Sequence, residues 1–208
     1  MKTKLTLFIA VLAFCFHQGY AQEKKVKITL DKGLLWQHAN HELKTDASKK
    51  YVYSMLPGYT VPRSISFWVN PSKLPGEAKL FWGQGLGIGM NGGRVKVYWY
   101  VSGWNGGDGY GQAIWCDTPK DQWTHISSAV FMDGTIKIRA YLNGKLVEEI
   151  DTKKKIGGAL GPDLNIGWDG RGNFFDGKLA NIRIYNRALS TEEVKALYDL
   201  EKPKSKTK

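Results

Sequence analysis

Hydrophobic and polar residues alternate with a period of two through much of the chain. The alternation is clearest in five segments, at residues 25–30, 64–69, 94–101, 135–142 and 180–185. A β-strand places successive side chains on opposite faces, so each segment is expected to form a strand with one face in the core and the other in solvent. The pattern therefore predicts a protein built mainly of antiparallel strands.

Turn signals separate these segments. An Asp-Gly pair at 133–134 and an Asn-Gly pair at 143–144 are typical of tight hairpins, because Asn, Asp and Gly tolerate a positive φ. They predict a three-stranded meander over residues 122–150. Two glycine-rich segments, at 103–111 and 168–173, are predicted to be loops.

One helix is predicted near the end of the chain. Ser190 and Glu193 have the spacing of a capping box, in which each side chain accepts a hydrogen bond from the other residue's backbone N–H. Val194, Leu197 and Tyr198 then fall on one face, which we expect to be buried. Many short strands and one terminal helix predict an all-β fold, a two-sheet antiparallel sandwich.

The first residues have the pattern of a secretory signal. Lys2 and Lys4 precede an apolar run at 5–16, and the segment 19–21 supplies small residues on either side of Tyr20. The apolar run is too short to cross a bilayer, which takes about 20 residues. We therefore expect cleavage after position 21 and a protein that is extracellular, periplasmic or exposed at the cell surface, without a transmembrane segment.

The chain is expected to have three parts. These are a signal peptide at 1–21, one folded domain at 22–201 and a basic tail at 202–208. Cleavage near Ala21 would remove Cys15 and leave Cys116 as the single cysteine, so no intrachain disulfide is expected. We expect Cys116 to be a buried, apolar thiol.

The net charge narrows the classes of partner. It is +11 at pH 7, and part of the excess lies in the signal peptide and the lysine-rich tail. The smaller excess on the folded domain favours an acidic polysaccharide or another cell-surface polyanion over nucleic acid. Solubility alone is an equally good explanation of that excess.

Several motifs occur in a recognisable order. They are Ser-Phe-Trp-Val-Asn-Pro at 66–71, Asp-Gln-Trp-Thr-His-Ile at 121–126, Ala-Tyr-Leu-Asn-Gly-Lys at 140–145, and a segment at 175–190 from Phe-Asp-Gly to Ala-Leu-Ser. This succession resembles the bacterial laminin-G-like jelly roll, a branch of the concanavalin A-like lectin and glucanase superfamily. The resemblance extends over roughly residues 26–200 and implies a jelly-roll sandwich.

The resemblance also bears on calcium, which members of this superfamily often bind. The family usually has an acidic residue near the positions where this chain has Ala180 and Asn181. A calcium site needs carboxylate and other oxygen ligands. Asp169, Asn173 and Asp176 remain as candidate ligands, with turn formation as the alternative role, and no other cofactor is expected.

No catalytic motif is visible. A retaining glycosidase needs two carboxyl groups about 5 Å apart, and the Glu-x-Asp-x-x-Glu strand of the glucanase branch is missing. Glu149 and Asp151 lie beside a turn and a run of lysines, so surface charge explains them, and His125 is expected to be a core or sheet histidine. A glycoside hydrolase or polysaccharide lyase remains a less favoured alternative. A lyase would draw on Arg94, Tyr98, Tyr100 and His125.

Two loops have the residue types that recognise sugars, since aromatic rings pack on the C–H faces of a pyranose and polar groups bind its hydroxyls. The candidates in the first loop are Trp104, Asn105, Asp108 and Tyr110. Those in the second loop are Trp168, Asp169, Arg171 and Asn173.

Two strand faces are further candidates. Arg94 and Lys96 share one side of a strand with Tyr98 and Tyr100. Lys137 and Arg139 are followed by Tyr141 in the same way on another strand. If both faces lay on the same side of the sandwich, they would form a cationic groove for an anionic ligand.

The sequence thus favours a secreted, non-catalytic carbohydrate-binding or surface-adhesion module, with an acidic polysaccharide as one candidate ligand. The alternative from another class is a structural or protein-interaction domain of the bacterial envelope. Exposed tryptophans that converge on one surface would favour the first function, and scattered, buried tryptophans the second.

Overall fold

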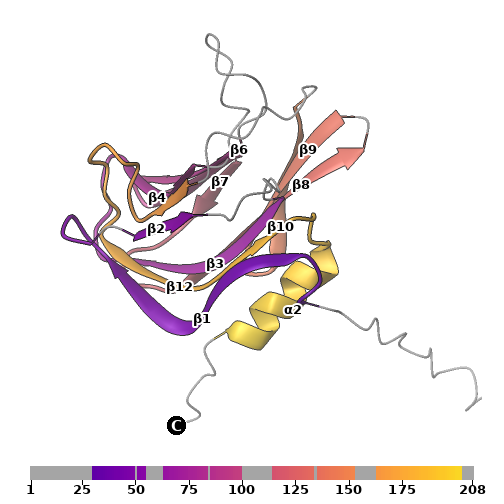
Figure 1. Cartoon of the computed structure of the whole chain (residues 1–208), viewed down its shortest axis with the longest axis horizontal. Coiled ribbons are helices and arrows are strands. Elements are labelled where there is room, and N and C mark those ends of the chain that lie inside the picture. The colour runs from indigo at the N-terminus through magenta and orange to yellow at the C-terminus, as the bar shows by residue number, and fades with distance from the viewer. Residues whose placement is uncertain are drawn as a thin grey trace, which may run out of the picture.

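The fold is a sandwich of two six-stranded antiparallel sheets, as the alternation of residues predicts (Figure 1). The computed structural model describes residues 30–49, 51–54, 63–83, 85–99, 114–133, 135–152 and 163–202. Sheet 1 has the strand order β1-β12-β3-β8-β9-β10, and sheet 2 has the order β2-β11-β4-β5-β6-β7.

The strand bounds are as follows. Sheet 1 contains β1 (Leu34–Thr45), β3 (Ser64–Pro71), β8 (Thr124–Asp133), β9 (Thr135–Leu142), β10 (Lys145–Asp151) and β12 (Gly177–Tyr185). Sheet 2 contains β2 (Tyr51–Ser54), β4 (Ala78–Gly83), β5 (Leu86–Asn91), β6 (Arg94–Trp99), β7 (Ile114–Asp117) and β11 (Asp163–Ile166). The helix is α2 (Thr191–Glu201).

The predicted meander is present as β8, β9 and β10. At the second hairpin Asn143 and Gly144 have φ values of 50° and 75°, the positive angles that a type I′ turn requires. The Asn143 side chain also accepts a 3.0 Å hydrogen bond from the backbone N–H of His125. Of the predicted strand at 25–30, all but Leu30 lies outside the described residues, and Leu30 lies in a turn before β1.

The core lies between the sheets. Phe67 from sheet 1 and Phe81 from sheet 2 are fully buried, with their ring centroids 4.8 Å apart. Cys116 is a buried free thiol, as expected, and burial raises its pKa to about 12. A thiol with such a pKa stays protonated and unreactive at neutral pH.

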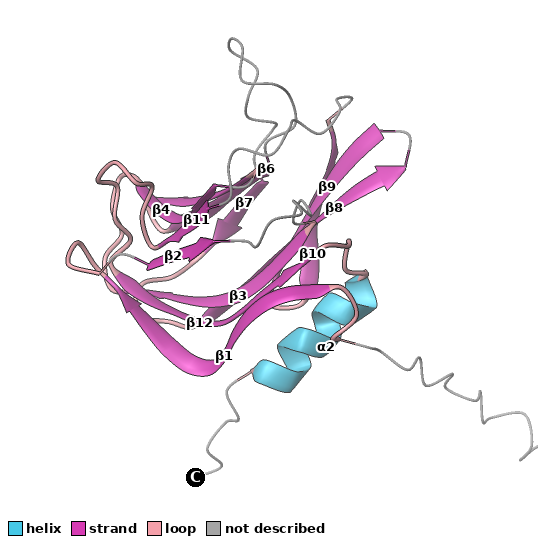
Figure 2. Ribbon diagram, viewed as in Figure 1, coloured by secondary structure: helices cyan, strands magenta, loops and turns pink. Residues whose placement is uncertain are grey.

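Helix α2 lies along the outer face of sheet 1 (Figure 2). Val194 and Leu197 are buried, as predicted, whereas Tyr198 is only partly buried and stacks on Trp68 at 5.7 Å. The helix also buries Tyr141 completely. The expected solvent-facing position of Tyr141 is therefore wrong, because α2 covers that part of the sheet.

The predicted capping box is present at the start of α2. Ser190 Oγ accepts a hydrogen bond from the Glu193 N–H at 3.2 Å, and the Glu193 carboxylate accepts one from the Ser190 N–H at 2.8 Å. Arg187 also binds this carboxylate through two nitrogens, each at 2.8 Å.

Ser190→Ala should lower the free energy of unfolding by about 1 kcal/mol, because it removes the N-cap acceptor. Chemical denaturation at neutral pH measures the change. Ser190→Asp, which keeps an acceptor oxygen, should recover most of the loss. Equal losses in the two variants would show that the hydroxyl acts through packing rather than capping.

Candidate functional site

The outer face of sheet 2 gathers aromatic and cationic side chains. Val95 and Val97 of β6 point into the core, so Lys96 and Tyr98 point outward. No helix in the described part of the chain covers this face, in contrast to the outer face of sheet 1.

Strand register places the outward residues in two rows across the sheet. The first row, called here the lysine row, is Lys79 of β4, Gly89 of β5, Lys96 of β6 and Trp115 of β7. The second, called here the aromatic row, is Asn165 of β11, Trp82 of β4, Gly87 of β5 and Tyr98 of β6. Each row thus has a glycine at the central strand β5.

The two glycines make room for the larger neighbours. A Cβ atom at Gly87 would lie 2.0 Å from Cε2 of Tyr98, so the tyrosine ring lies directly over Gly87. A Cβ atom at Gly89 would lie 2.9 Å from the Ala78 carbonyl oxygen and 3.6 Å from Cδ of Lys79. Neither position accepts a side chain without movement of its neighbours.

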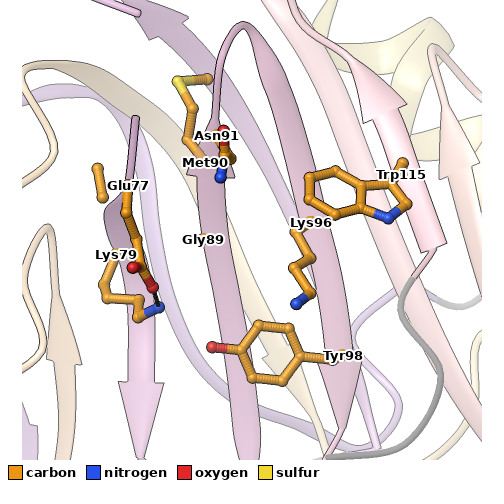
Figure 3. A pocket seen from close by; sticks show the side chains of 9 residues that line it. Glu77, Lys79, Gly89, Met90, Asn91, Lys96, Tyr98 and Trp115 are labelled. Carbon is orange, nitrogen blue, oxygen red and sulfur yellow. Dashed lines mark hydrogen bonds and ion pairs between the residues drawn. The ribbon is translucent and has the colours of Figure 1, made fainter. Parts of the chain in front are cut away.

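A hollow of about 210 Å³ opens over this part of the sheet. Figure 3 shows Lys79 and Lys96 on either side of β5, with Trp115 to the right of Lys96 and the Tyr98 ring below them. Tyr98 is only 5% exposed, so it forms part of the floor and is not a free stacking platform. Trp82 and Trp115 are half-buried and keep part of their surface in contact with solvent.

Cation–π contacts fix the basic side chains in place. The Lys96 ammonium lies 5.3 Å from the ring centroid of Tyr98 and 5.5 Å from that of Trp115. The Lys79 ammonium lies 5.4 Å from the Trp82 ring. Such contacts contribute about 0.5–1 kcal/mol at exposed sites and more where water is excluded. They hold the two ammonium groups close to the hollow.

The ion pairs of the face differ from one cation to the next. Lys79 pairs with Glu77, and Arg94 pairs with Asp117 at 3.2 Å while also lying over Trp115. Lys96 has no carboxylate within ion-pair distance among the residues that the structure describes. The face therefore retains a positive charge at the centre of the lysine row.

The structure places some of the sequence candidates on this face and not others. Arg94, Lys96 and Tyr98 belong to it. Tyr100 and the first-loop candidates Trp104, Asn105, Asp108 and Tyr110 lie outside the described residues. The segment that contains them joins β6 to β7, two strands of this face.

Lys137 and Arg139 lie on β9 of sheet 1, on the opposite side of the sandwich from β6. The two strand faces therefore do not form one groove, which corrects that expectation. Arg139 pairs with Glu149 and lies over the Phe131 ring at 4.3 Å, so its charge is locally compensated.

The second predicted loop is organised by its own hydrogen bonds. Asp169 Oδ1 accepts bonds from the N–H groups of Arg171, Gly172 and Asn173 at 2.7, 2.9 and 3.2 Å, and Oδ2 accepts one from the Asn173 side chain at 2.5 Å. Burial alone would raise the pKa of Asp169, but these hydrogen bonds hold it below its ordinary value. Trp168 stacks on Phe174 with centroids 6.2 Å apart.

These contacts do not fit a calcium site. The Asp169 oxygens are occupied by protein donors, and Asp176 pairs with Lys73 at 2.6 Å. Within the described ranges, no group of three or more His, Cys, Asp or Glu residues is placed to hold a metal ion. Turn formation accounts for the roles of Asp169 and Asn173.

His125 is a buried sheet histidine, as expected. Its Nε2 is 2.8 Å from the Ser66 hydroxyl, and its ring contacts Trp68 and Tyr198 under α2. Burial lowers its pKa to about 3, so the imidazole is neutral at pH 7. Because His125 lies on the helix side of sheet 1, the structure does not bring it together with Arg94 and Tyr98 as a lyase would require.

Sequence reasoning missed three members of the site: Lys79, Trp82 and Trp115. Trp115 alternates with the buried residues Ile114 and Cys116, so the period of two could have identified it. A register shift between Lys79 and Phe81 interrupts the alternation in β4, so the period of two does not predict that Lys79 and Trp82 lie on the same face.

Comparison with solved structures finds the same fold in binding domains of bacterial toxins. The receptor binding domain of botulinum neurotoxin C/D mosaic serotype aligns with a TM-score of 0.64 and 16% identity over 81% of this chain and 45% of that chain. The receptor binding domain of botulinum neurotoxin D aligns with a TM-score of 0.64 and 12% identity, over 83% and 54% of the two chains. This chain thus spans about half the length of these proteins.

A third neighbour is the binding domain of botulinum neurotoxin DC in complex with SialylT, with a TM-score of 0.61 and 14% identity, over 83% of this chain and 52% of that one. No curated protein matches the sequence. In the described part of the chain, no helix is long and apolar enough to cross a membrane. Residues 47–195 match the laminin-G-like family model described as the concanavalin A-like lectin/glucanases superfamily, and the chain belongs to that family.

Proposed function

We propose that the protein is a secreted, non-catalytic carbohydrate-binding module and that the outer face of sheet 2 holds the ligand. One observation carries the proposal. The lysine row and the aromatic row bring tryptophan, tyrosine and lysine side chains together around Gly87 and Gly89 of β5. No helix in the described part of the chain covers this face.

The chemistry of this face suits a sugar. The C–H faces of a pyranose pack on aromatic rings, and two half-buried tryptophans supply such rings. Trp115 lines the hollow, and Trp82 lies on β4 beside Gly87. Lysine ammonium groups and the Asn165 amide are donors for hydroxyl oxygens. The hollow of 210 Å³ is smaller than the roughly 300–1,000 Å³ that encloses a drug-sized ligand, so it suits one ring or substituent of a longer glycan.

The arrangement of tryptophans favours binding over a purely structural role. Trp68 and Trp99 are buried, and their indole N–H groups are satisfied by Glu201 and Ser128. Trp82 and Trp115, in contrast, lie on the same outer face and in neighbouring rows. The superfamily includes lectins, and one solved structure of this fold is a binding domain in complex with SialylT, which supports the same proposal.

Trp115→Ala should weaken glycan binding by roughly ten- to thirtyfold, because it removes about 1.5–2 kcal/mol of ring burial. The ligand is first identified on an array of neutral and acidic glycans, and its affinity is then measured by calorimetry. The loss should be similar at low and high salt, since ring packing is not screened by ions.

Trp123→Ala is the matched control. Trp123 is also half-buried but precedes β8 of sheet 1, away from the proposed face, so the variant should keep the wild-type affinity. An equal loss in both variants, or an array without any bound glycan, would refute the proposal. Release of new reducing ends or unsaturated products from the ligand would refute the non-catalytic part.

A further inference from the structure

We propose that the lysine row is an anion subsite, in which Lys79 and Lys96 together bind one carboxylate or sulfate substituent of a sugar above Gly89. This inference rests on the proposed function and names the chemical class of ligand that the same face takes. Three observations support it: the positions of the Lys79 and Lys96 ammonium groups, the space between them, and the absence of a carboxylate partner for Lys96 among the described residues.

The register creates the space for the anion. Lys79 and Lys96 are both paired with Gly89, from opposite sides of β5. Strands lie about 4.8 Å apart, so the two lysine backbones are separated by about 10 Å, with no side chain between them. Figure 3 shows the two side chains on either side of β5, with the Lys96 ammonium directed toward β5 and the Lys79 ammonium joined to Glu77. Both lysines line the hollow, and we place the anion in the space between them.

The charge balance of the hollow favours an anion. Lys96 has no carboxylate partner in the described part of the chain, and the one acid that lines the hollow is Glu77. The Glu77 side chain is 61% exposed, whereas that of its partner Lys79 is only 13% exposed. Ion pairs with an exposed partner are weak, because water and salt screen them. An incoming anion can therefore displace Glu77 into solvent while Lys79 remains in place.

The aromatic rings make the two lysines suited to this role. Contacts with Trp82, Tyr98 and Trp115 hold both ammonium groups in position, which reduces the side-chain entropy lost when a ligand binds. They also exclude water from one side of each charge, so attraction to an anion is less screened than at an open surface.

The same features favour a substituted sugar over a nucleic acid. A nucleic acid backbone requires a series of cations along its phosphates, whereas Lys79 and Lys96 flank the single position above Gly89. Trp115 stands at the end of the lysine row, where the ring of a sugar that carries the anion could pack against it. The ligand class is therefore a uronate or sulfated oligosaccharide.

The test compares matched pairs of oligosaccharides by calorimetry. One pair is a galacturonate oligomer and its methyl ester, and the other is a dextran sulfate oligomer and unsulfated dextran of the same length. The wild-type protein should prefer the charged member of at least one pair by about tenfold, the effect expected of a hydrogen bond to a charged group. The pair that shows the preference distinguishes a carboxylate ligand from a sulfate ligand.

Three variants locate the effect. Lys96→Gln and Lys79→Gln should each weaken binding of the charged oligomer by about tenfold. Both variants should affect the uncharged oligomer much less, because the glutamine amide can still donate a hydrogen bond to a sugar hydroxyl. Lys137→Gln makes the same change of charge on sheet 1 and should change neither affinity by more than about twofold, because it acts only through long-range, screened electrostatics.

A fourth variant is expected to gain affinity. Glu77→Gln removes the internal competitor of the anion and should tighten binding of the charged oligomer by up to about fivefold, in line with the strength of an exposed ion pair. Glu148→Gln, on β10 of sheet 1, is the matched control and should have no such effect. Lys96→Arg keeps the charge and should retain most of the affinity for the charged oligomer. That result would show that the loss in Lys96→Gln comes from the missing charge and not from altered folding.

The outcomes separate this inference from the proposed function. If charged and uncharged oligomers bind equally well and Trp115→Ala weakens both, the anion subsite is refuted and the carbohydrate-binding function stands. If no oligosaccharide binds, but sodium sulfate shifts the Trp115 indole resonance in wild type and not in Lys96→Gln, the anion site stands and the carbohydrate-binding function is refuted. Equal losses in Lys137→Gln and Lys96→Gln, or tighter binding of duplex DNA than of any oligomer, would overturn the subsite.

Discussion

Glu201→Ala is expected to lower the free energy of unfolding by about 3–5 kcal/mol, the usual effect of removing one partner of a buried ion pair. The Glu201 side chain is 5% exposed and accepts a 2.7 Å hydrogen bond from Nε of Arg183, whose side chain is 13% exposed. It also accepts a 3.2 Å bond from the indole N–H of Trp68. The variant leaves a guanidinium and an indole N–H without this acceptor beneath α2, and chemical denaturation measures the loss.

Glu201→Gln is the informative control. Burial raises the pKa of Glu201 above its ordinary value, although Arg183 and Trp68 lower it, so the carboxylate is not ideally stabilised in the folded protein. Glutamine keeps an acceptor oxygen and carries no charge to desolvate. Glu201→Gln should therefore lower the free energy of unfolding by only about 1 kcal/mol, the size of an ordinary hydrogen-bond contribution. Losses of the same size in the two variants would mean that the helix is docked by packing alone.

Acidification from pH 7 to pH 5 is expected to reduce stability by about 2 kcal/mol through His125 alone. Burial depresses the pKa of His125 from 6.5 to about 3. Below pH 6.5 the unfolded chain therefore binds a proton that the folded protein excludes, and stability falls as the pH falls. At pH 7 the imidazole is mostly neutral in both states, so His125 costs almost no stability. The loss of stability grows as the pH falls and levels off near pH 3, where the folded imidazole is protonated as well.

His125→Gln isolates this effect, because glutamine can still bond to Ser66 but does not titrate. The difference in unfolding free energy between wild type and variant should shrink by about 2 kcal/mol between pH 7 and pH 5. Asp169 and Glu193 have lowered pKa values, so their stabilisation is lost only at lower pH, and Glu201 acts in the opposite direction. A constant difference between the two proteins would show that the His125 imidazole titrates in the folded protein as it does in the unfolded chain.

Local patterns were sufficient for most of the fold. The alternation at Val95 and Val97, the Asn143-Gly144 turn and the Ser190 cap each act over a few residues, and each is present in the structure. Tyr141 shows where local reasoning ends. A period of two identifies the face on which a side chain lies but not whether a distant helix covers that face.

The proposed binding face was harder to predict because it depends on register. Gly87 and Gly89 are unremarkable in the sequence, and they acquire a role only when Tyr98 and Lys79 are placed beside them by neighbouring strands. The loop around Asp169 is the opposite case. It has the composition of a sugar site, but the Asp169 carboxylate accepts hydrogen bonds from the backbone of the loop itself. Composition alone does not predict these hydrogen bonds.

Both ends of the described chain lie on the helix side of the sandwich. Leu30 packs against the hydrophobic cluster beneath α2, and Lys202 caps that helix, so each end is remote from the outer face of sheet 2 (Figure 1). A support or partner domain joined before Leu30 or after Lys202 would leave the lysine row pointing away from the point of attachment. Many copies fixed in this way would display their proposed binding faces in one direction. If the ligand is a polymeric glycan, it could engage several copies at once and gain avidity without tighter single sites.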